Sequence, residues 1–307
     1  MWIAVIPAHN EADSIGKVLE NLHPCNFYRI MLVANGCDDL TEEAALHSIK
    51  IHHSAGISQS AGINQPAGIN HSTEISQSAD INQPAGIGQL ELLSFPEPLG
   101  LDVPRAIGAA YARKHHPQAQ GVVFIDGDLL GAITAPVLDL LKGLDRGLDL
   151  ALTNCYPHTG PHSDLAATVL QYRETVNKKL GLSTKIGLAT PSHGPHALSA
   201  RLLTKIPPQV LAIPPLTLAW TALHNFKIDV AAAIPHELLG SKFRSTEHAS
   251  QIAATIIDDC QQALAYLEGT PLTELFADAK NLTGYRKLRR FDLLEAFLAE
   301  LESPGSS

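Results

Sequence analysis

The feature that most constrains this sequence is a series of short apolar segments in its first half, each followed by polar residues. Four of them have the length and apolar, β-branched character of buried strands: residues 2–6, 29–34, 90–95 and 120–125. Residues 15–22 carry apolar side chains at helical spacing and are followed by Pro24, and residues 104–116 also predict a helix. Strands that alternate with helices predict right-handed βαβ crossovers and a mainly parallel sheet flanked by helices.

The second half of the chain continues this pattern less regularly. It predicts two further strands, over residues 148–153 and 228–234. Helices are expected over residues 137–144, 163–180, 195–204, 215–224, 246–268 and 278–301. We therefore expect one α/β domain over residues 1–240 and a helical C-terminal extension over residues 241–307.

Residues 54–89 interrupt the α/β pattern with tandem hexapeptides that carry Ile at every sixth position. One interpretation is a short left-handed β-helix in which these Ile side chains stack. The segment would make only about two coils, fewer than the three or more repeats that such folds usually need. The hexapeptide insertion is therefore better explained as an expanded surface loop, and neither interpretation gives it catalytic chemistry.

Three polar clusters follow predicted strands: residues 7–11, 35–39 and 126–128. Ligands of such sheets lie beyond the carboxyl ends of the strands, so we expect these clusters to meet at one edge. Asp126 and Asp128 are separated by a glycine, which lets the backbone turn so that both carboxylates face a common point. Such a pair suits Mg2+ or Mn2+ that also takes diphosphate oxygens, although Asp-Gly-Asp is also a common turn after a strand.

Several motifs resemble those of family 2 glycosyltransferases and occur in the family order. Residues 5–15, VIPAHNEADSI, resemble the opening strand and loop of that family, and residues 33–41, VANGCDDLT, are similar to its second-strand motif. Residues 100–108 resemble the Gly-rich entry of the helix that precedes the family's DxD strand. The resemblance covers residues 1–130, apart from the insertion, and is weaker beyond. It implies a GT-A fold, which is a Rossmann-like α/β fold, and a nucleotide-sugar donor.

The resemblance also implies roles for individual residues of the donor site. Pro7, Ala8 and Glu11 would line the nucleoside, with Glu11 accepting a hydrogen bond from the ribose or base. Asn35 would read the edge of a pyrimidine, because its amide both donates and accepts. Arg105 would approach the base or diphosphate. The alternatives are a carboxylate favoured by a helix start for Glu11, a left-handed turn residue for Asn35 and an exposed helix cation for Arg105.

A late histidine is implied as a third metal or phosphate ligand. His236, which follows the strand predicted over residues 228–234, fits that place, and His248 is the competing candidate. Imidazole is a less natural ligand for Mg2+ than for transition metals. The segment PSHGPH, residues 191–196, resembles the acceptor-side loop of the family, where His193 would face the acceptor.

The sequence departs from the family at its general base. Many inverting members carry a carboxylate at the start of the helix that here reads IPPLTLAW, residues 213–220, and this segment has none. The base is therefore unassigned. Either another group such as His193 deprotonates the acceptor, or the acceptor is already an anion, or the enzyme retains configuration without a protein base.

Composition excludes some partners. The formal net charge of −9 argues against a nucleic-acid partner. The four cysteines are far apart in sequence and predict reduced thiols in a cytoplasmic protein.

No apolar run reaches the roughly 18 residues of a membrane-spanning helix, which leaves only peripheral membrane contact. Arg286, Arg289 and Arg290 suggest a small basic patch, either a solvated helix face or a contact for an acidic acceptor or lipid headgroup.

The sequence therefore predicts an enzyme that transfers a sugar from a UDP- or GDP-sugar to an unidentified hydroxyl or phosphate acceptor, with a divalent cation at Asp126 and Asp128. A rival class is a sugar-phosphate nucleotidyltransferase. That class begins with a Gly-rich, Arg-containing loop after the first strand, whereas residues 7–11 read PAHNE. A third class is a nucleotide-sugar binding protein without catalytic activity.

Overall fold

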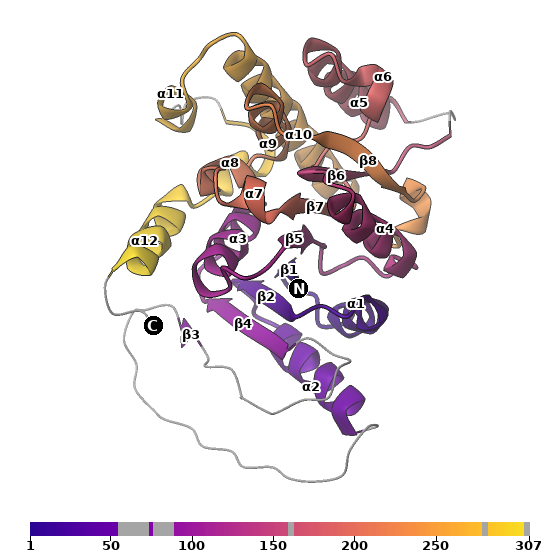
Figure 1. Cartoon of the computed structure of the whole chain (residues 1–307), viewed down its shortest axis with the longest axis vertical. Coiled ribbons are helices and arrows are strands. Elements are labelled where there is room, and N and C mark those ends of the chain that lie inside the picture. Colours follow the sequence, from indigo (N-terminus) through magenta and orange to yellow (C-terminus); the bar gives the residue numbers. More distant parts are fainter. Residues whose placement is uncertain (55–73, 76–88, 159–162, 278–281, 304–307) are drawn as a thin grey trace.

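The computed structural model describes residues 1–54, 74–75, 89–158, 163–277 and 282–303 (Figure 1). Its sheet has the strand order β3-β4-β2-β1-β5-β7-β6-β8 over these residues. The strands are β1 (Trp2–Ala8), β2 (Arg29–Asn35), β3 (Glu74–Ile75), β4 (Gln89–Phe95), β5 (Gly121–Phe124), β6 (Leu150–Asn154), β7 (His196–Ser199) and β8 (Ile228–Ala233). Most of the predicted hexapeptide insertion, residues 54–89, lies outside the described residues.

The sheet is mainly parallel, as predicted. The pairs β1–β2, β1–β5, β2–β4 and β6–β8 are parallel. The strand β7 lies antiparallel between β5 and β6, and β3 pairs antiparallel with β4 at one edge. The carboxyl ends of β1, β2, β5, β6 and β8 therefore face the same rim, and the amino end of β7 faces that rim as well.

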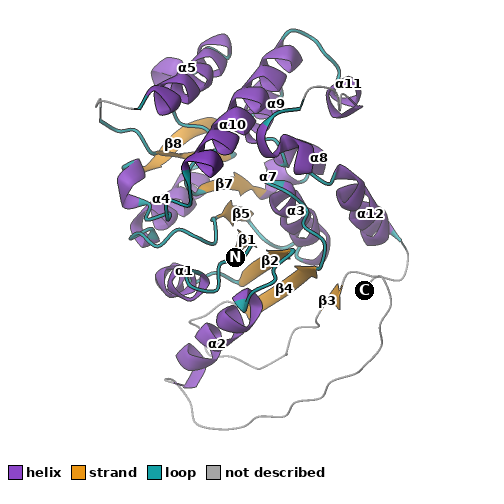
Figure 2. Ribbon diagram, turned by 180° about the vertical axis from the view of Figure 1, so that it is seen from behind, coloured by secondary structure: helices purple, strands orange, loops and turns teal. Residues whose placement is uncertain are grey.

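Helices cover both faces of the sheet (Figure 2). The longer ones are α1 (Ile15–Leu22), α2 (Thr41–Ser54), α3 (Val103–His115), α4 (Thr134–Asp145), α5 (Asp164–Lys179), α9 (Pro214–Leu223), α10 (Thr246–Leu267) and α12 (Phe291–Glu302). The shorter ones are α6 (Ser183–Ile186), α7 (Ala200–Leu203), α8 (Pro208–Leu211), α11 (Leu272–Ala277) and the 3-10 turns η1 (His23–Cys25), η2 (His236–Leu238) and η3 (Gly284–Leu288). None of the described helices combines the length and apolar character needed to cross a membrane.

The alternation of side chains along the strands produces two hydrophobic cores. In β1, Ile3 and Val5 point into a core shared with α3, α8, α9 and α12, whereas Ala4 and Ile6 point into a core shared with α1 and α4. A strand buried on both faces reads as a continuous apolar run, which is why its position was predictable from sequence.

Two predictions about the second half are wrong. Residues 195–204 do not form one helix, because His196–Ser199 is the strand β7 and only Ala200–Leu203 is helical. A short apolar run suits a strand and a helix equally, and here hydrogen bonding to β5 and β6 decides for the strand. The predicted helix over 278–301 is likewise divided, since η3 and α12 are separate elements.

The C-terminal helices pack against the rest of the chain. The helix α10 contacts α5 and α9, and α12 contacts α3 (Figure 1). Leu294, Phe297 and Leu301 of α12 belong to the same hydrophobic core as β1. The division into residues 1–240 and 241–307 stays a prediction.

Candidate donor site at the carboxyl edge of the sheet

The three predicted polar clusters meet at the carboxyl edge of the sheet. The amide of Gly127 donates to the carbonyl of Pro7 at 3.2 Å, and His9 Nδ1 lies 2.7 Å from the carbonyl oxygen of Asn35. A Cβ on Gly127 would lie 3.1 Å from the Pro7 oxygen and 3.2 Å from Ala8 Cβ. The residues after β5 can therefore lie directly against the end of β1, because a glycine separates the two aspartates.

Asp126 forms an ion pair with Arg105, for which the sequence predicted either a contact with the donor or a solvent-exposed position on a helix. Arg105 on α3 is buried and forms ion pairs with both Asp126 and Asp102. Burial acts to lower the pKa of Arg105, but Asp126 and then Asp102 more than offset this, so the pKa is raised. The alternative of an exposed helix cation is therefore wrong, and a contact of Arg105 with the base or diphosphate stays a prediction.

Asp128 lies in an acidic environment. Burial, followed by the charges of Asp126 and Glu11, raises the pKa of Asp128 from 3.8 to about 6, and Arg244 only partly offsets this. Glu11 pairs with Arg244 and accepts a hydrogen bond from Ser14 Oγ at 2.8 Å. A divalent cation would fit beside these carboxylates, because it would relieve the repulsion that raises the pKa of Asp128.

The described residues bring no three His, Cys, Asp or Glu side chains together as a metal site. The predicted ligand set of Asp126, Asp128 and His236 therefore stays a prediction. Mg2+ is commonly bound through one or two carboxylates together with substrate phosphates and water, so two aspartates would suffice as protein ligands for such a cation.

The side-chain amide of Asn35 forms hydrogen bonds with the backbone of the loop before α3. Its Oδ1 accepts from the amide of Leu99 at 2.6 Å, and its Nδ2 donates to the carbonyl of Gly100 at 3.3 Å. The left-handed turn position is Gly36, at φ +59, so the turn alternative for Asn35 is wrong. Asn35 fixes the loop that precedes α3, and its contact with a base stays a prediction.

His193 and His236 form a pair beside an aromatic ring. Nε2 of His193 lies 2.8 Å from Nδ1 of His236, and both imidazoles stack with Tyr156 at centroid distances of 5.5 and 6.1 Å. Burial, then Arg173 and His236, lowers the pKa of His193 well below 6.5, so the ring is neutral. The competing candidate His248 instead contacts the hydroxyl of Tyr285 at 2.7 Å through Nδ1.

The position of His193 follows from the strand that was predicted as a helix. His196 of β7 pairs with Phe124 of β5 in the antiparallel register. Because β7 runs opposite to β5, the residues just before β7 lie at the same edge as the residues just after β5. His193 and Asp126 are therefore placed on one rim of the sheet, from segments about seventy residues apart in sequence.

Sequence reasoning missed two arginines. Arg244 pairs with Glu11, and no motif of the sequence marks it. Arg173 is buried in α5, and its Nε and Nη1 have no hydrogen-bond partner within the described residues. Its guanidinium carbon lies 6.0 Å from the ring centroid of Tyr156. A sequence signal existed for Arg173, because it interrupts the helical apolar stripe formed by Val169, Leu170 and Val176.

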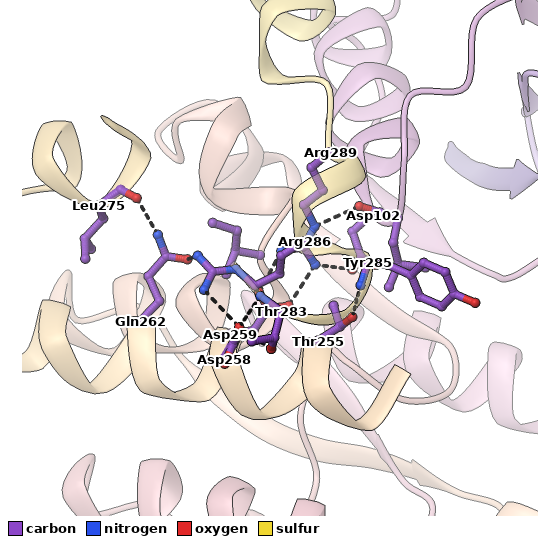
Figure 3. Close-up of polar contacts among 12 residues, drawn as sticks. Asp102, Thr255, Asp258, Asp259, Gln262, Leu275, Thr283, Tyr285, Arg286 and Arg289 are labelled. Carbon is purple, nitrogen blue, oxygen red and sulfur yellow. Dashed lines mark hydrogen bonds and ion pairs between the residues drawn. The ribbon is translucent and has the colours of Figure 1, made fainter. Parts of the chain in front are cut away.

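The predicted basic patch of the C-terminal segment is also wrong. Arg289 is buried and forms ion pairs with Asp102 and Asp259 (Figure 3). Arg290 pairs with Asp292 and Glu97. Arg286 pairs with Asp259 at 3.3 Å and donates to Gln262 at 2.7 Å. Their positive charges are matched within the protein, which leaves no solvated cationic face.

Comparisons with known proteins give a fold. No family model and no curated protein matches the chain. Among solved structures, a glucosyl-3-phosphoglycerate synthase from Mycobacterium tuberculosis in complex with Mn2+, UDP and phosphoglyceric acid is 18% identical, with a TM-score of 0.52 over 85% of this chain and 78% of that chain. A second structure of that synthase, with Mn2+, UDP-glucose and phosphoglyceric acid, gives a TM-score of 0.51 at 18% identity over 85% and 80%. A structure described only as a mycobacterial protein gives 0.54 at 18% identity over 88% and 76%.

Proposed function

We propose that this chain, which has the GT-A fold of these sugar transferases, moves a sugar from a nucleoside diphosphate sugar to an acidic acceptor. The proposed donor is a UDP- or GDP-sugar, and the proposed cofactor is Mn2+ or Mg2+. The observation that carries the proposal is the acidic rim. Asp128 lies beside Asp126 and Glu11 at the edge where ligands of such sheets bind, and burial together with these two charges raises the pKa of Asp128 to about 6.

The donor would lie across the loops that follow β1, β2 and β5. In this proposal Pro7, Ala8 and Glu11 contact the nucleoside, and Asp126 and Asp128 hold the cation. When bound, the cation offsets the charge that develops on the departing diphosphate. Arg244, which pairs with Glu11, is a further cation at this rim that can meet the same charge.

The acceptor would bind on the β7 side of the rim. Its oxygen forms a bond to the anomeric carbon, and the bond from that carbon to the diphosphate oxygen breaks. Where the acceptor group is a hydroxyl, the neutral ring of His193 can take its proton while His236 holds the imidazole in place. The departing nucleoside diphosphate carries the electron pair of the broken bond.

An acidic acceptor is supported by Arg173. A buried guanidinium usually has an anionic or hydrogen-bonding partner, and this one has two nitrogens without any such partner in the described part of the chain. The guanidinium carbon of Arg173 lies 6.0 Å from the ring centroid of Tyr156, which stacks with His193, and this proximity supports a role for Arg173 on the proposed acceptor side. The synthase structures in complex with phosphoglyceric acid make that molecule the first acceptor to test.

Calorimetric titration tests the donor site. We expect the wild type to bind UDP or GDP more tightly with Mn2+ than without it. Asp126→Ala/Asp128→Ala should weaken metal-dependent binding by about a hundredfold or more, because even groups behind the ligands of a metal contribute ten- to a hundredfold. Asp139→Ala is the matched control, because among the residues that the structure describes this exposed aspartate of α4 pairs with Lys142 alone.

Binding of the nucleotide that is independent of Mn2+, or that survives the double substitution, would contradict the proposed site. A nucleotide-sugar binding protein without activity would bind the donor and release no UDP or GDP in the presence of phosphoglyceric acid or any other acceptor. Release of the nucleoside diphosphate above the rate without protein excludes that alternative.

A further inference from the structure

A chain of alternating charges connects the C-terminal segment with Asp126. Asp259 of α10 accepts from Arg289 Nη1 at 2.6 Å and from Nη2 at 2.8 Å. Arg289 Nη2 also donates to Asp102 Oδ2 at 2.9 Å. Asp102 pairs with Arg105, and Arg105 pairs with Asp126. We call these five side chains the charge chain; Figure 3 shows its part from Asp259 through Arg289 to Asp102.

The charge chain runs from the interior of the protein to the donor rim. Side-chain exposure is 3% for Asp259, 1% for Arg289, 8% for Asp102, 9% for Arg105 and 33% for Asp126. Salt screens buried pairs only weakly, and the charges there must remain paired. The orientation of each member is therefore fixed by its neighbours, and Asp126 is the member that solvent and ligand can reach.

The C-terminal segment also fixes the backbone before α3. Arg289 Nε donates to the carbonyl of Leu101 at 2.9 Å, and the amide of Arg290 donates to the carbonyl of Leu99 at 2.9 Å. A Cβ on Gly100 would lie 2.3 Å from the carbonyl oxygen of Leu288, so the two segments are in direct contact. The same loop forms hydrogen bonds with both the Oδ1 and the Nδ2 of Asn35.

Asp102 adopts a conformation that needs such support. It has a left-handed backbone, with φ +66, immediately before α3, and its side chain does not cap that helix. This conformation costs a non-glycine residue conformational free energy, so it persists where contacts with the surrounding structure stabilise it. Here the carboxylate of Asp102 forms ion pairs with Arg105 and Arg289 and makes no capping hydrogen bond to α3.

We propose that Arg289 is a positioning residue for the donor site, which acts through Asp102 and Arg105 to orient the carboxylate of Asp126. The C-terminal segment would then be part of the machinery that binds the donor, although none of its residues in the charge chain reaches the rim. This inference rests on the proposed function, because it assigns the donor as the ligand that Asp126 meets.

Substitutions at two adjacent arginines separate positioning from general stability. Arg289→Lys keeps the charge but loses the planar fork that contacts Asp102 and Asp259 together. We expect it to weaken binding of UDP or GDP with Mn2+ by about tenfold, within the range of coupled sites. Arg290→Met is the control, because this side chain is more exposed and, within the described ranges, pairs with Glu97 and Asp292 alone. It should change the affinity by less than about twofold.

A second variant covers the case in which Arg289→Lys does not fold. Arg289→Met/Asp259→Leu replaces the buried pair by apolar groups, a change that is often tolerated, and it removes the contact with Asp102. Arg286 loses its contact with Asp259 but keeps those with Asp258 and Gln262. The melting temperature of each variant shows at which temperatures it is folded, and nucleotide affinities are measured at those temperatures. Folded variants that bind the nucleotide as tightly as the wild type would overturn the inference, because a merely structural role lowers the melting temperature and leaves the affinity unchanged.

Hydrogen exchange on the wild type gives an independent result. If Arg289 orients Asp126, ligand binding at Asp126 must in turn stabilise the surroundings of Arg289. The amides of residues 286–290 should then exchange more slowly when the nucleotide and Mn2+ are bound. Unchanged exchange there in a wild type that does bind the nucleotide refutes the positioning role alone. A wild type that binds neither UDP nor GDP refutes the proposed function instead.

Discussion

One carboxylate at the rim, that of Asp128, lies where the folded protein disfavours its charge. Burial, followed by the charges of Asp126 and Glu11, raises the pKa of this side chain from 3.8 to about 6. The folded state therefore binds a proton more readily than the unfolded state between these two values. The charge of Asp128 costs folding stability at all pH values above about 6, and this cost disappears as the pH falls below 3.8.

Asp128→Asn should therefore stabilise the metal-free protein while it weakens the proposed metal site. At pH 7.5 we expect the free energy of unfolding to rise by about 1 to 3 kcal/mol, because one pKa unit corresponds to about 1.4 kcal/mol. The gain should be clearly smaller at pH 4.5, where the wild-type side chain is largely protonated in the folded state. Denaturant unfolding at both pH values measures this, and an equal gain at both would show that the charge is not its cause.

At the scale of elements, the loop after β8 is held against the loop after β5. The amide of Gly131 donates to the carbonyl of Leu239 at 2.9 Å. A Cβ on Gly131 would lie 1.9 Å from the carbonyl oxygen of Leu238, and Gly240 has a left-handed backbone with φ +79. Residues 236–244 carry His236 and Arg244, so this close approach determines where both side chains lie relative to the rim.

Gly131→Ala should displace residues 236–244 from the rim, because a backbone oxygen cannot move away alone. We expect affinity for the nucleotide with Mn2+ to fall several-fold and the free energy of unfolding to fall by about 1 to 3 kcal/mol. Gly181→Ala is the control: its φ is +69 and a Cβ there meets nothing within 4 Å. It should cost about 1 kcal/mol of stability and leave the affinity unchanged. Equal affinities for both variants would contradict the role given to this contact.

At the scale of the whole molecule, the donor rim belongs to the α/β sheet, and the hexapeptide insertion lies between α2 and β4. Between residues 55 and 88 the structure describes the two-residue edge strand β3, which pairs with Ser94 and Leu93 of β4. The central strands β1, β2 and β5, which carry the rim, are paired with one another and with β4 and β7.

Replacement of residues 55–88 by a flexible linker of about six residues should therefore preserve the donor site. Nucleotide affinity in the presence of Mn2+ is expected to stay within about twofold of the wild type, since loop length affects closure entropy only weakly. Calorimetry on the shortened protein measures this. Loss of binding in a folded, shortened protein would mean that the insertion contributes to the site.

Much of the first half was predictable because the information is local. Runs of apolar, β-branched residues located β1, β2, β4 and β5, and the spacing of Ile15, Val18, Leu19 and Leu22 located α1. The strand β7 was not predictable, because four residues of its composition suit either element and only pairing with β5 and β6 decides.

By itself the sequence determined a mainly parallel sheet whose polar clusters share one rim, because strand periodicity and chain order dictate where strand ends lie. Only the tertiary structure decided the partners of those clusters. Arg105 is buried against Asp126, Arg289 reaches Asp102 from 187 residues away, and His193 meets His236 across 43 residues. Such contacts depend on how segments distant in sequence pack together. The local sequence around a charged residue is the same whether its side chain is solvated or forms an ion pair in the interior.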